Sequence, residues 1–157
     1  MLLLLVLGSL AAATARADGE PILPGSYLKV EEAVAKSDVV FEAKLTRAGE
    51  ILMKDAAKYV GPTYTGAQAT GASFYKGHAG EPVHLSIFVH GGYQETVPVV
   101  GQSYLFFVSG PRAGGEYEVM KMLLATKENR RTTLRAFFND SAQKKQALPP
   151  PPPPSAA

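Results

Sequence analysis

The chain has 157 residues, which is the size of one domain. It contains no cysteine, which excludes disulfide bonds and the lipid-modified cysteine of a bacterial lipoprotein. Its 16 basic and 14 acidic residues give a formal net charge of +2 at pH 7, too small for the electrostatic surface that binds nucleic acid or an anionic membrane.

The first seventeen residues have the pattern of a secretory signal peptide. Residues 2–10 are almost wholly apolar, and Ala15-Arg16-Ala17 forms an A-x-A cleavage site before Asp18. A membrane-spanning helix needs roughly 18 or more apolar residues, and this run is shorter. We therefore expect residues 1–17 to be removed, leaving no stable membrane anchor and a secreted or periplasmic protein.

Residues 18–29 are predicted to form an extended lead-in, because two prolines and two glycines interrupt residues 18–26. Residues 30–37 then carry apolar side chains at helical spacing. Glu31 and Glu32 fall in the first turn, where negative charge stabilises a helix. This pattern predicts a short amphipathic helix.

Five segments are predicted as strands, and they are residues 38–46, 63–75, 83–90, 104–108 and 116–124. The first alternates apolar and polar residues. The second is built from small residues whose glycines predict bends or bulges. The third alternates between an inner set of Val83, Leu85, Ile87 and Val89 and an outer set of His84, Ser86, Phe88 and His90. The fourth is apolar on both faces, which predicts a central strand with Tyr104, Phe106 and Phe107 in the core.

The segments outside the predicted strands have weaker patterns. Residues 48–62 fit either a loop or one helical turn. Thr126 is a predicted N-cap for a helix that reaches Lys145, with apolar contacts from Leu134, Phe137 and Phe138. Residues 146–157 are predicted to be a disordered proline-rich tail, with residues 149–154 in polyproline II. Such a tail serves as a spacer or docks on an aromatic groove.

The order of these elements predicts a mainly β domain over residues 30–145. Five strands with frequent turn signals, one leading helix and one trailing helix favour a small five-stranded barrel over a sandwich. A parallel α/β fold is disfavoured because helices do not separate the strands.

No motif in the sequence indicates catalysis or metal binding. Six strand residues place His84 and His90 about 20 Å apart, whereas zinc holds each ligand nitrogen at about 2.0–2.1 Å. Residues 88–92, Phe-Val-His-Gly-Gly, resemble the oxyanion-hole strand of esterases, but no serine has the required G-x-S-x-G setting. Residues 66–73 lack the lysine of a phosphate-binding loop. We expect no catalytic residue, metal, cofactor or nucleic-acid partner.

Three motifs occur in the order found in netrin-like domains, the group that includes the tissue inhibitors of metalloproteinases. Residues 30–44 resemble their opening helix, which ends in Ser-Asp before the first strand. Residues 74–77, Phe-Tyr-Lys-Gly, resemble the end of the second strand, and residues 101–107 resemble the Gly-x-x-Tyr-Leu-x-Phe of the fourth. Exported bacterial proteins of unassigned function show the same series. The resemblance covers about residues 30–124 and implies an OB-like barrel and a binding role.

The resemblance does not extend to the inhibitory mechanism of that group. Those inhibitors bind the protease zinc through a mature N-terminal cysteine, whereas the predicted mature N-terminus here is Asp18 and the chain has no cysteine. No functional residue is therefore transferred from the group to this sequence.

These observations favour an exported, non-enzymatic domain that binds a protein or glycan in the cell envelope or outside the cell. The candidate ligand-binding surface consists of His84, Phe88, His90 and Tyr93. Phe88 forms a sticky patch if it is exposed, or lies under the C-terminal helix if it is covered. The alternatives are a small secreted hydrolase that uses His90, which needs a serine or carboxylate partner, and a structural component of the envelope.

Overall fold

The computed structural model describes residues 19–52 and 61–147. The predicted signal peptide, Asp18, residues 53–60 and the proline run lie outside the described residues.

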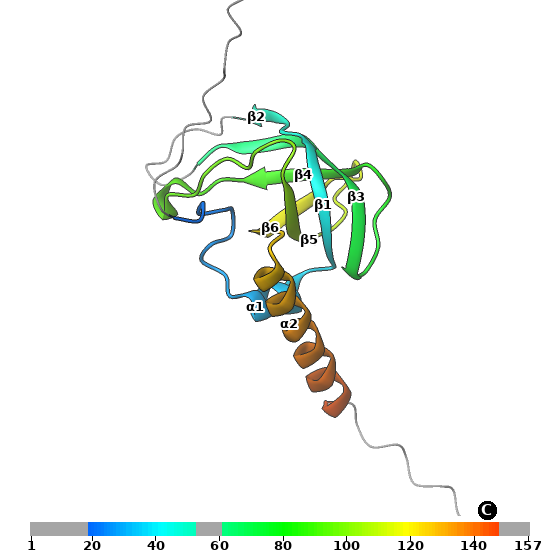
Figure 1. Cartoon of the computed structure of the whole chain (residues 1–157). Helices are drawn as coiled ribbons and strands as arrows, with labels where there is room; N and C mark the ends of the chain where they lie inside the picture. The colour runs from blue at the N-terminus through cyan, green and yellow to red at the C-terminus, as the bar shows by residue number, and fades with distance from the viewer. Residues whose placement is uncertain (1–18, 53–60, 148–157) are drawn as a thin grey trace, which may run out of the picture.

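Within the described residues, five strands close into a β-barrel (Figure 1). They are β1 (Val39–Arg47), β3 (Thr63–Lys76), β4 (Val83–Phe88), β5 (Ser103–Ser109) and β6 (Tyr117–Leu124). β1 pairs with β3 and β5, β5 with β6, β6 with β4, and β4 with β3, so the sheet returns to its first strand. All these pairings are antiparallel except that of β4 with β6. The predicted OB-like fold class is confirmed.

The long strand β3 bends so that it pairs with two different strands of the barrel. Its first half pairs with β4 and its second half with β1, and register shifts interrupt both ladders. Gly66 and Gly71 have φ values of +70° and +71°, a backbone conformation that glycine adopts without steric cost. The small-residue segment therefore bends where its glycines predicted.

Residues 48–62 contain a strand that the sequence did not predict. The three residues of β2 (Glu50–Leu52) pair with Thr63–Thr65 of β3, extending the sheet beyond the barrel. All three are exposed. The strand depends on its partner because so short a segment has no periodicity of its own.

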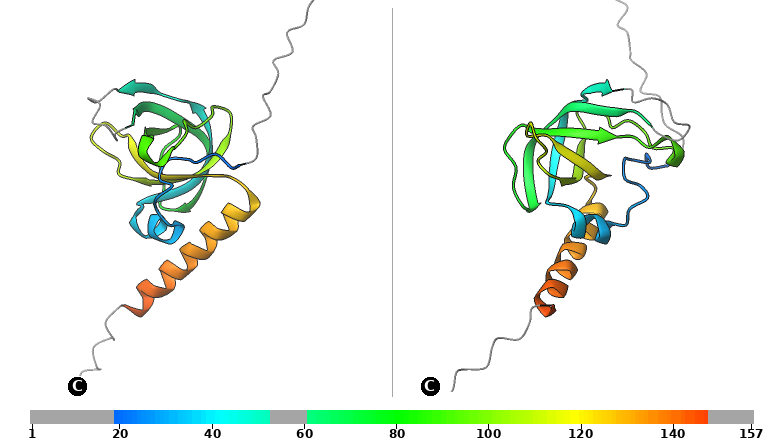
Figure 2. Two further views of the ribbon diagram at one scale, coloured as in Figure 1. Left: turned by 90° about the vertical axis from the view of Figure 1, so that its left-hand side faces the viewer. Right: turned by 180° about the vertical axis from the view of Figure 1, so that it is seen from behind.

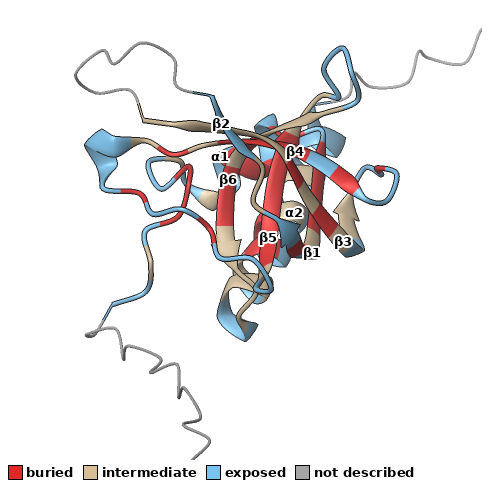
Figure 3. Ribbon diagram, turned by 90° about the horizontal axis from the view of Figure 1, so that it is seen from above, coloured by how far each residue is buried: buried red, intermediate tan, exposed pale blue. Residues whose placement is uncertain are grey.

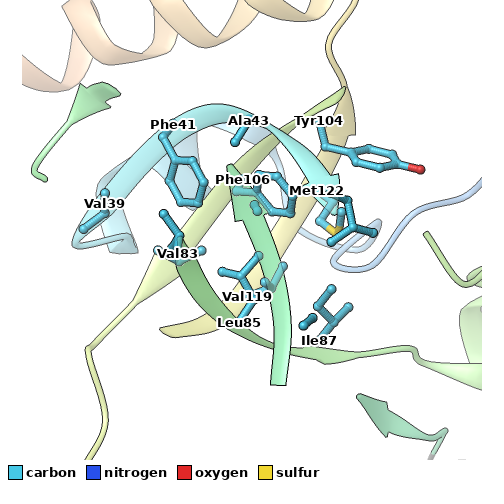
Figure 4. Packing of buried hydrophobic residues seen from close by; sticks show 14 of the residues in the cluster. Val39, Phe41, Ala43, Val83, Leu85, Ile87, Tyr104, Phe106, Val119 and Met122 are labelled. Carbon is cyan, nitrogen blue, oxygen red and sulfur yellow. The ribbon is translucent and has the colours of Figure 1, made fainter. Parts of the chain in front are cut away.

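The barrel core is formed by the inward faces of the strands, and their side chains meet along the barrel axis (Figure 4). The predicted inner residues of the first and third strands are all buried there. Phe41 and Phe106 stack with ring centroids 5.1 Å apart and are fully buried. Ser86, predicted on the outer face of β4, is also buried. Figure 3 shows that buried segments follow the strands, while exposed ones follow the loops.

A second apolar cluster joins the outer side of the barrel to the helices α1 (Val30–Lys36) and α2 (Lys127–Gln146). Leu105 and Phe107 of β5 point into it, so the prediction of a central strand that is apolar on both faces is confirmed. As predicted, Thr126 caps α2 by accepting a hydrogen bond from the amide of Asn129 at 3.2 Å.

The predicted apolar face of α2 is partly wrong. The buried residues of the helix are Thr133 and Ala136, whose small side chains let α2 pack closely against α1, and Phe137 is partly buried beside them. Leu134 and Phe138 are exposed. After this contact α2 continues away from the barrel (Figure 2).

The end of β3 fixes the junction between α1 and β1. The ammonium group of Lys76 donates hydrogen bonds to the carbonyl oxygens of Val34, at 2.8 Å, and of Ser37. Burial lowers the pKa of Lys76. Gly77 lies so close to Asp38 that a Cβ atom there would come within 2.5 Å of the Asp38 carbonyl oxygen. Lys76 therefore closes the junction by hydrogen bonds, and Gly77 allows the close approach of β3 to Asp38.

Candidate functional site

Four aromatic side chains gather at the rim of the barrel, where β4 ends and the short helix η1 (Gly91–Tyr93) follows. Tyr27 of the lead-in stacks on Tyr93, with ring centroids 5.2 Å apart and an interplanar angle of 30°. His90 contacts Tyr93 at 4.7 Å and Phe88 edge-on at 5.7 Å. We call Tyr27, Phe88, His90 and Tyr93 the rim cluster.

The two tyrosines of the rim cluster face solvent. Tyr27 is 53% exposed and Tyr93 is 50% exposed, whereas Phe88 and His90 beneath them are half-buried. Neither tyrosine hydroxyl has a hydrogen-bond partner within the described residues. The cluster therefore presents apolar ring surface together with two available O–H donors.

A buried carboxylate holds the two halves of the rim cluster together. Glu95 accepts hydrogen bonds from the amide and hydroxyl of Ser26, at 3.0 and 2.9 Å, and from the amide of His90 at 2.7 Å. Ser26 precedes Tyr27, and His90 precedes η1. Because one carboxylate binds both segments, it fixes the lead-in beside the loop that carries Tyr93.

The lead-in is also bound along its backbone. The amides of Thr96 and Met122 donate to the carbonyl oxygens of Ile22 and Pro24, at 2.7 and 2.8 Å. Gly25 has a φ of +78° and lies against β6, where a Cβ atom would come within 2.1 Å of the Met120 carbonyl oxygen. Residues 22–26 are thus bound to the barrel by backbone hydrogen bonds and by the close approach of Gly25 to β6.

Lys121 of β6 also binds the lead-in. Its ammonium group is buried and donates to the Gly25 carbonyl oxygen at 3.1 Å. Burial lowers the pKa of Lys121, while the nearby charge of Glu95 acts in the opposite direction. The rim cluster therefore rests on a buried polar layer whose groups are hydrogen-bonded.

A pocket of about 260 Å³ opens beside the rim cluster. Tyr27 and Phe88 form part of its wall, and Met120 adds apolar surface. It also contains the carboxylates of Glu95 and of Glu118, the second of which pairs with Arg112. The wall of this pocket therefore combines aromatic rings with acidic residues.

The structure brings together three of the four residues predicted for the ligand-binding surface. Phe88, His90 and Tyr93 belong to the rim cluster, but His84 does not. His84 lies near the start of β4, exposed, in a separate hollow lined by Pro82 and Pro111. The extended strand carries His84 away from the other three. Phe88 is neither freely exposed nor fully covered, since it is half-buried beneath His90.

The sequence analysis missed Tyr27 and Glu95. Tyr27 reaches the cluster from 66 residues away in the chain, a contact that no local pattern encodes. Glu95 carries a weak signal, because it is the sole acidic residue between Glu81 and Glu116. A single carboxylate in an apolar loop is a candidate for a buried acceptor.

Within the described residues, the rim cluster lacks the partner groups that catalysis or metal binding by His90 would need. Nδ1 of His90 is buried without a hydrogen-bond partner, and no hydroxyl or carboxylate in residues 19–52 and 61–147 is bonded to that ring. No three potential metal-binding side chains within the same ranges are grouped closely enough to hold an ion.

In the part of the chain that the structure describes, no helix combines the length and apolar character needed to cross a membrane. No protein-family model and no curated protein sequence matches this chain.

Proposed function

We propose that this protein is an exported, non-enzymatic binding domain that holds a protein or glycan ligand on the rim cluster. The observation that carries the proposal is the stacked pair of Tyr27 and Tyr93, half exposed and fixed from below by Glu95. Rigid aromatic rings that remain in contact with solvent are typical of binding surfaces, because they bury a large apolar area with little loss of side-chain entropy.

The signal-peptide pattern of residues 1–17 supports export, and with it a ligand in the envelope or outside the cell. The small net charge of the chain favours a neutral surface over nucleic acid as the partner.

A netrin-like origin of the domain is part of this proposal. Two of the three motifs on which the resemblance depends contact each other, since Lys76 and Gly77 pack on the Ser37-Asp38 junction. The third motif opens β5, which pairs with the β1 strand that this junction begins. Motifs that are distant in sequence but meet in the fold support a common design more strongly than each motif alone.

The binding function is preferred over a hydrolase because of the surroundings of His90. A catalytic histidine needs a nucleophile and an orienting partner within hydrogen-bond reach. The His90 ring lies against the aromatic rings of Tyr27, Phe88 and Tyr93. These neighbours stabilise a stacked arrangement and supply no proton relay.

Affinity capture from the fluid into which the native host exports the protein tests the proposal. We expect the purified exported chain to retain a discrete protein or glycan, and the double variant Tyr27→Ala/Tyr93→Ala to retain at least tenfold less. The double variant Leu134→Ala/Phe138→Ala is the matched control, because it removes exposed apolar groups from α2. Equal retention by both variants would contradict the proposed site. A protein that retains nothing discrete would favour the structural component.

A further inference from the structure

We propose that the rim cluster of one molecule binds the proline run 149–154 of a second molecule, so that the protein associates with itself head to tail. This inference rests on the proposed function, because it names the partner of the same surface. The chain thus carries both an exposed aromatic surface and the type of segment that such surfaces bind.

The chemistry of the two partners is complementary. A run of prolines has no N–H donors and offers apolar rings and carbonyl acceptors. The rim cluster offers the faces of Tyr27 and Tyr93, together with two hydroxyl donors that have no partner within the described residues. The tyrosine faces can therefore pack against proline rings, and the two hydroxyls can donate to two of the carbonyl oxygens of the run.

The ligand also suits the shape of the site. The pocket of about 260 Å³ is lined by Tyr27, Phe88 and Met120 among others, so apolar surface extends beyond the tyrosine pair. Polyproline segments bind to aromatic-lined grooves with a small entropic cost, because their backbone is already restricted. A six-proline run is long enough to cover the pair and enter the pocket.

The segment between α2 and the end of the proline run is too short for the run to bind the rim cluster of its own molecule. α2 has 20 residues and, at about 1.5 Å per residue, is about 30 Å long. It leads away from the barrel, so its C-terminal end lies away from the strands (Figures 1 and 2). Pro154 is eight residues beyond Gln146, a reach of at most about 29 Å.

Those eight residues could at most return along α2 to the level of its first turn. The proline run would then lie along α2, and it could not also cover Tyr27 and Tyr93. A second molecule has no such restriction, because its helix can approach the cluster from solvent. The proline run and the rim cluster are different surfaces, so the contact is heterologous and each molecule both gives and receives one segment.

Sedimentation velocity on the purified exported chain, at rising concentration, tests this inference. We expect the wild-type chain to form oligomers that grow with concentration. A variant with residues 149–154 all changed to serine keeps the length of the chain, and we expect it to remain monomeric. The variant Tyr27→Ala/Tyr93→Ala should also remain monomeric, whereas the control Leu134→Ala/Phe138→Ala should associate like the wild type.

Mixing the two monomeric variants gives the sharpest result. One has an intact cluster and the other an intact proline run, so an equimolar mixture should form dimers and nothing larger. A mixture that stays monomeric would overturn the inference, as would a serine variant that associates like the wild type. A synthetic six-proline peptide is the direct probe, and it should change the tyrosine fluorescence of the serine variant but not that of the same variant with Tyr27→Ala/Tyr93→Ala.

The same proteins separate this inference from the proposed function. A serine variant that associates like the wild type, and still captures an external ligand through Tyr27 and Tyr93, would overturn self-association and leave the binding function in place. If removal of the two tyrosines changes neither association nor capture, both proposals fail.

Discussion

Two stacked aromatic pairs in this molecule have nearly the same geometry and very different surroundings. Phe41 and Phe106 stack at 5.1 Å inside the barrel and are fully buried. Tyr27 and Tyr93 stack at 5.2 Å on the rim, and about half of each remains in contact with water. Burial, rather than ring geometry, separates a pair that stabilises the fold from a pair that is available to a ligand.

The supports of the two pairs differ as well. The core pair is surrounded by the apolar side chains of five strands. The rim pair is held by hydrogen bonds that Glu95 accepts from the lead-in and from the loop after β4. A site positioned by a polar network can keep its rings exposed, because its rigidity does not depend on their burial.

The largest effect is expected from the core. Phe106→Ala should destabilise the protein by about 3–5 kcal/mol, because it removes a fully buried ring and leaves a cavity. Urea unfolding followed by circular dichroism measures this change. Phe138→Ala is the control, since this ring is 65% exposed and its loss should change the free energy of unfolding by about 0.5 kcal/mol or less. Equal losses would show that the assignment of the core is wrong.

A smaller effect is expected at the support of the rim cluster. Glu95→Gln should cost about 2–3 kcal/mol, because hydrogen bonds to a charged acceptor are each worth about 1.5–3 kcal/mol and an amide satisfies the three donors poorly. Limited proteolysis should then cut the lead-in near Ser26 faster than in the wild type. Glu50→Gln is the control, since its carboxylate is largely exposed. A lead-in that stays protected in the Glu95 variant would contradict the role of this carboxylate.

A third effect depends on pH and concerns neither aromatic pair. The guanidinium of Arg130 donates two hydrogen bonds of 2.7 Å to the carboxylate of Glu42, and these bonds, more than the charge attraction, hold the pKa of Glu42 below its usual 4.5. Because the pKa is lowered in the folded state, the pair stabilises the protein above pH 4.5 and loses this contribution as the pH falls through the folded-state pKa.

Unfolding of the wild type and of Arg130→Gln across pH 3–7 measures this effect. The difference between the two proteins should be present at neutral pH, smaller in high salt, and smaller toward the acid end. Arg131→Gln, an exposed neighbour on the same helix, should show no such dependence. A difference that persists at low pH would mean that Arg130 acts through packing instead.

The sequence predicts the barrel better than the rim. Strands such as β1 and β5 are visible because each carries its own alternation or its own apolar run over seven to nine residues. β2 is not visible, because three exposed residues become a strand only by pairing with β3. The face of α2 was mistaken for a similar reason, since its contact with α1 uses Thr133 and Ala136 rather than the large apolar residues.

The sequence pattern grouped only those residues of the candidate site that lie on β4 and in the loop after it. Phe88, His90 and Tyr93 lie within six residues, so a local pattern was enough to group them. Tyr27 and Glu95 belong to the same site through long-range hydrogen bonds and stacking, which depend on the closed barrel. Strand alternation also grouped His84 with the others, whereas the structure places it apart, because residues on one face of a strand can lie at its opposite ends.

The most direct test of the account compares Tyr27→Ala/Tyr93→Ala with the wild type by urea unfolding. If the rim pair is reserved for a ligand, its removal should change the free energy of unfolding by about 1 kcal/mol or less, the sum expected for two surface substitutions, with an unchanged dependence on urea. A loss approaching that of Phe106→Ala would contradict the account, because the rim pair would then be part of the core.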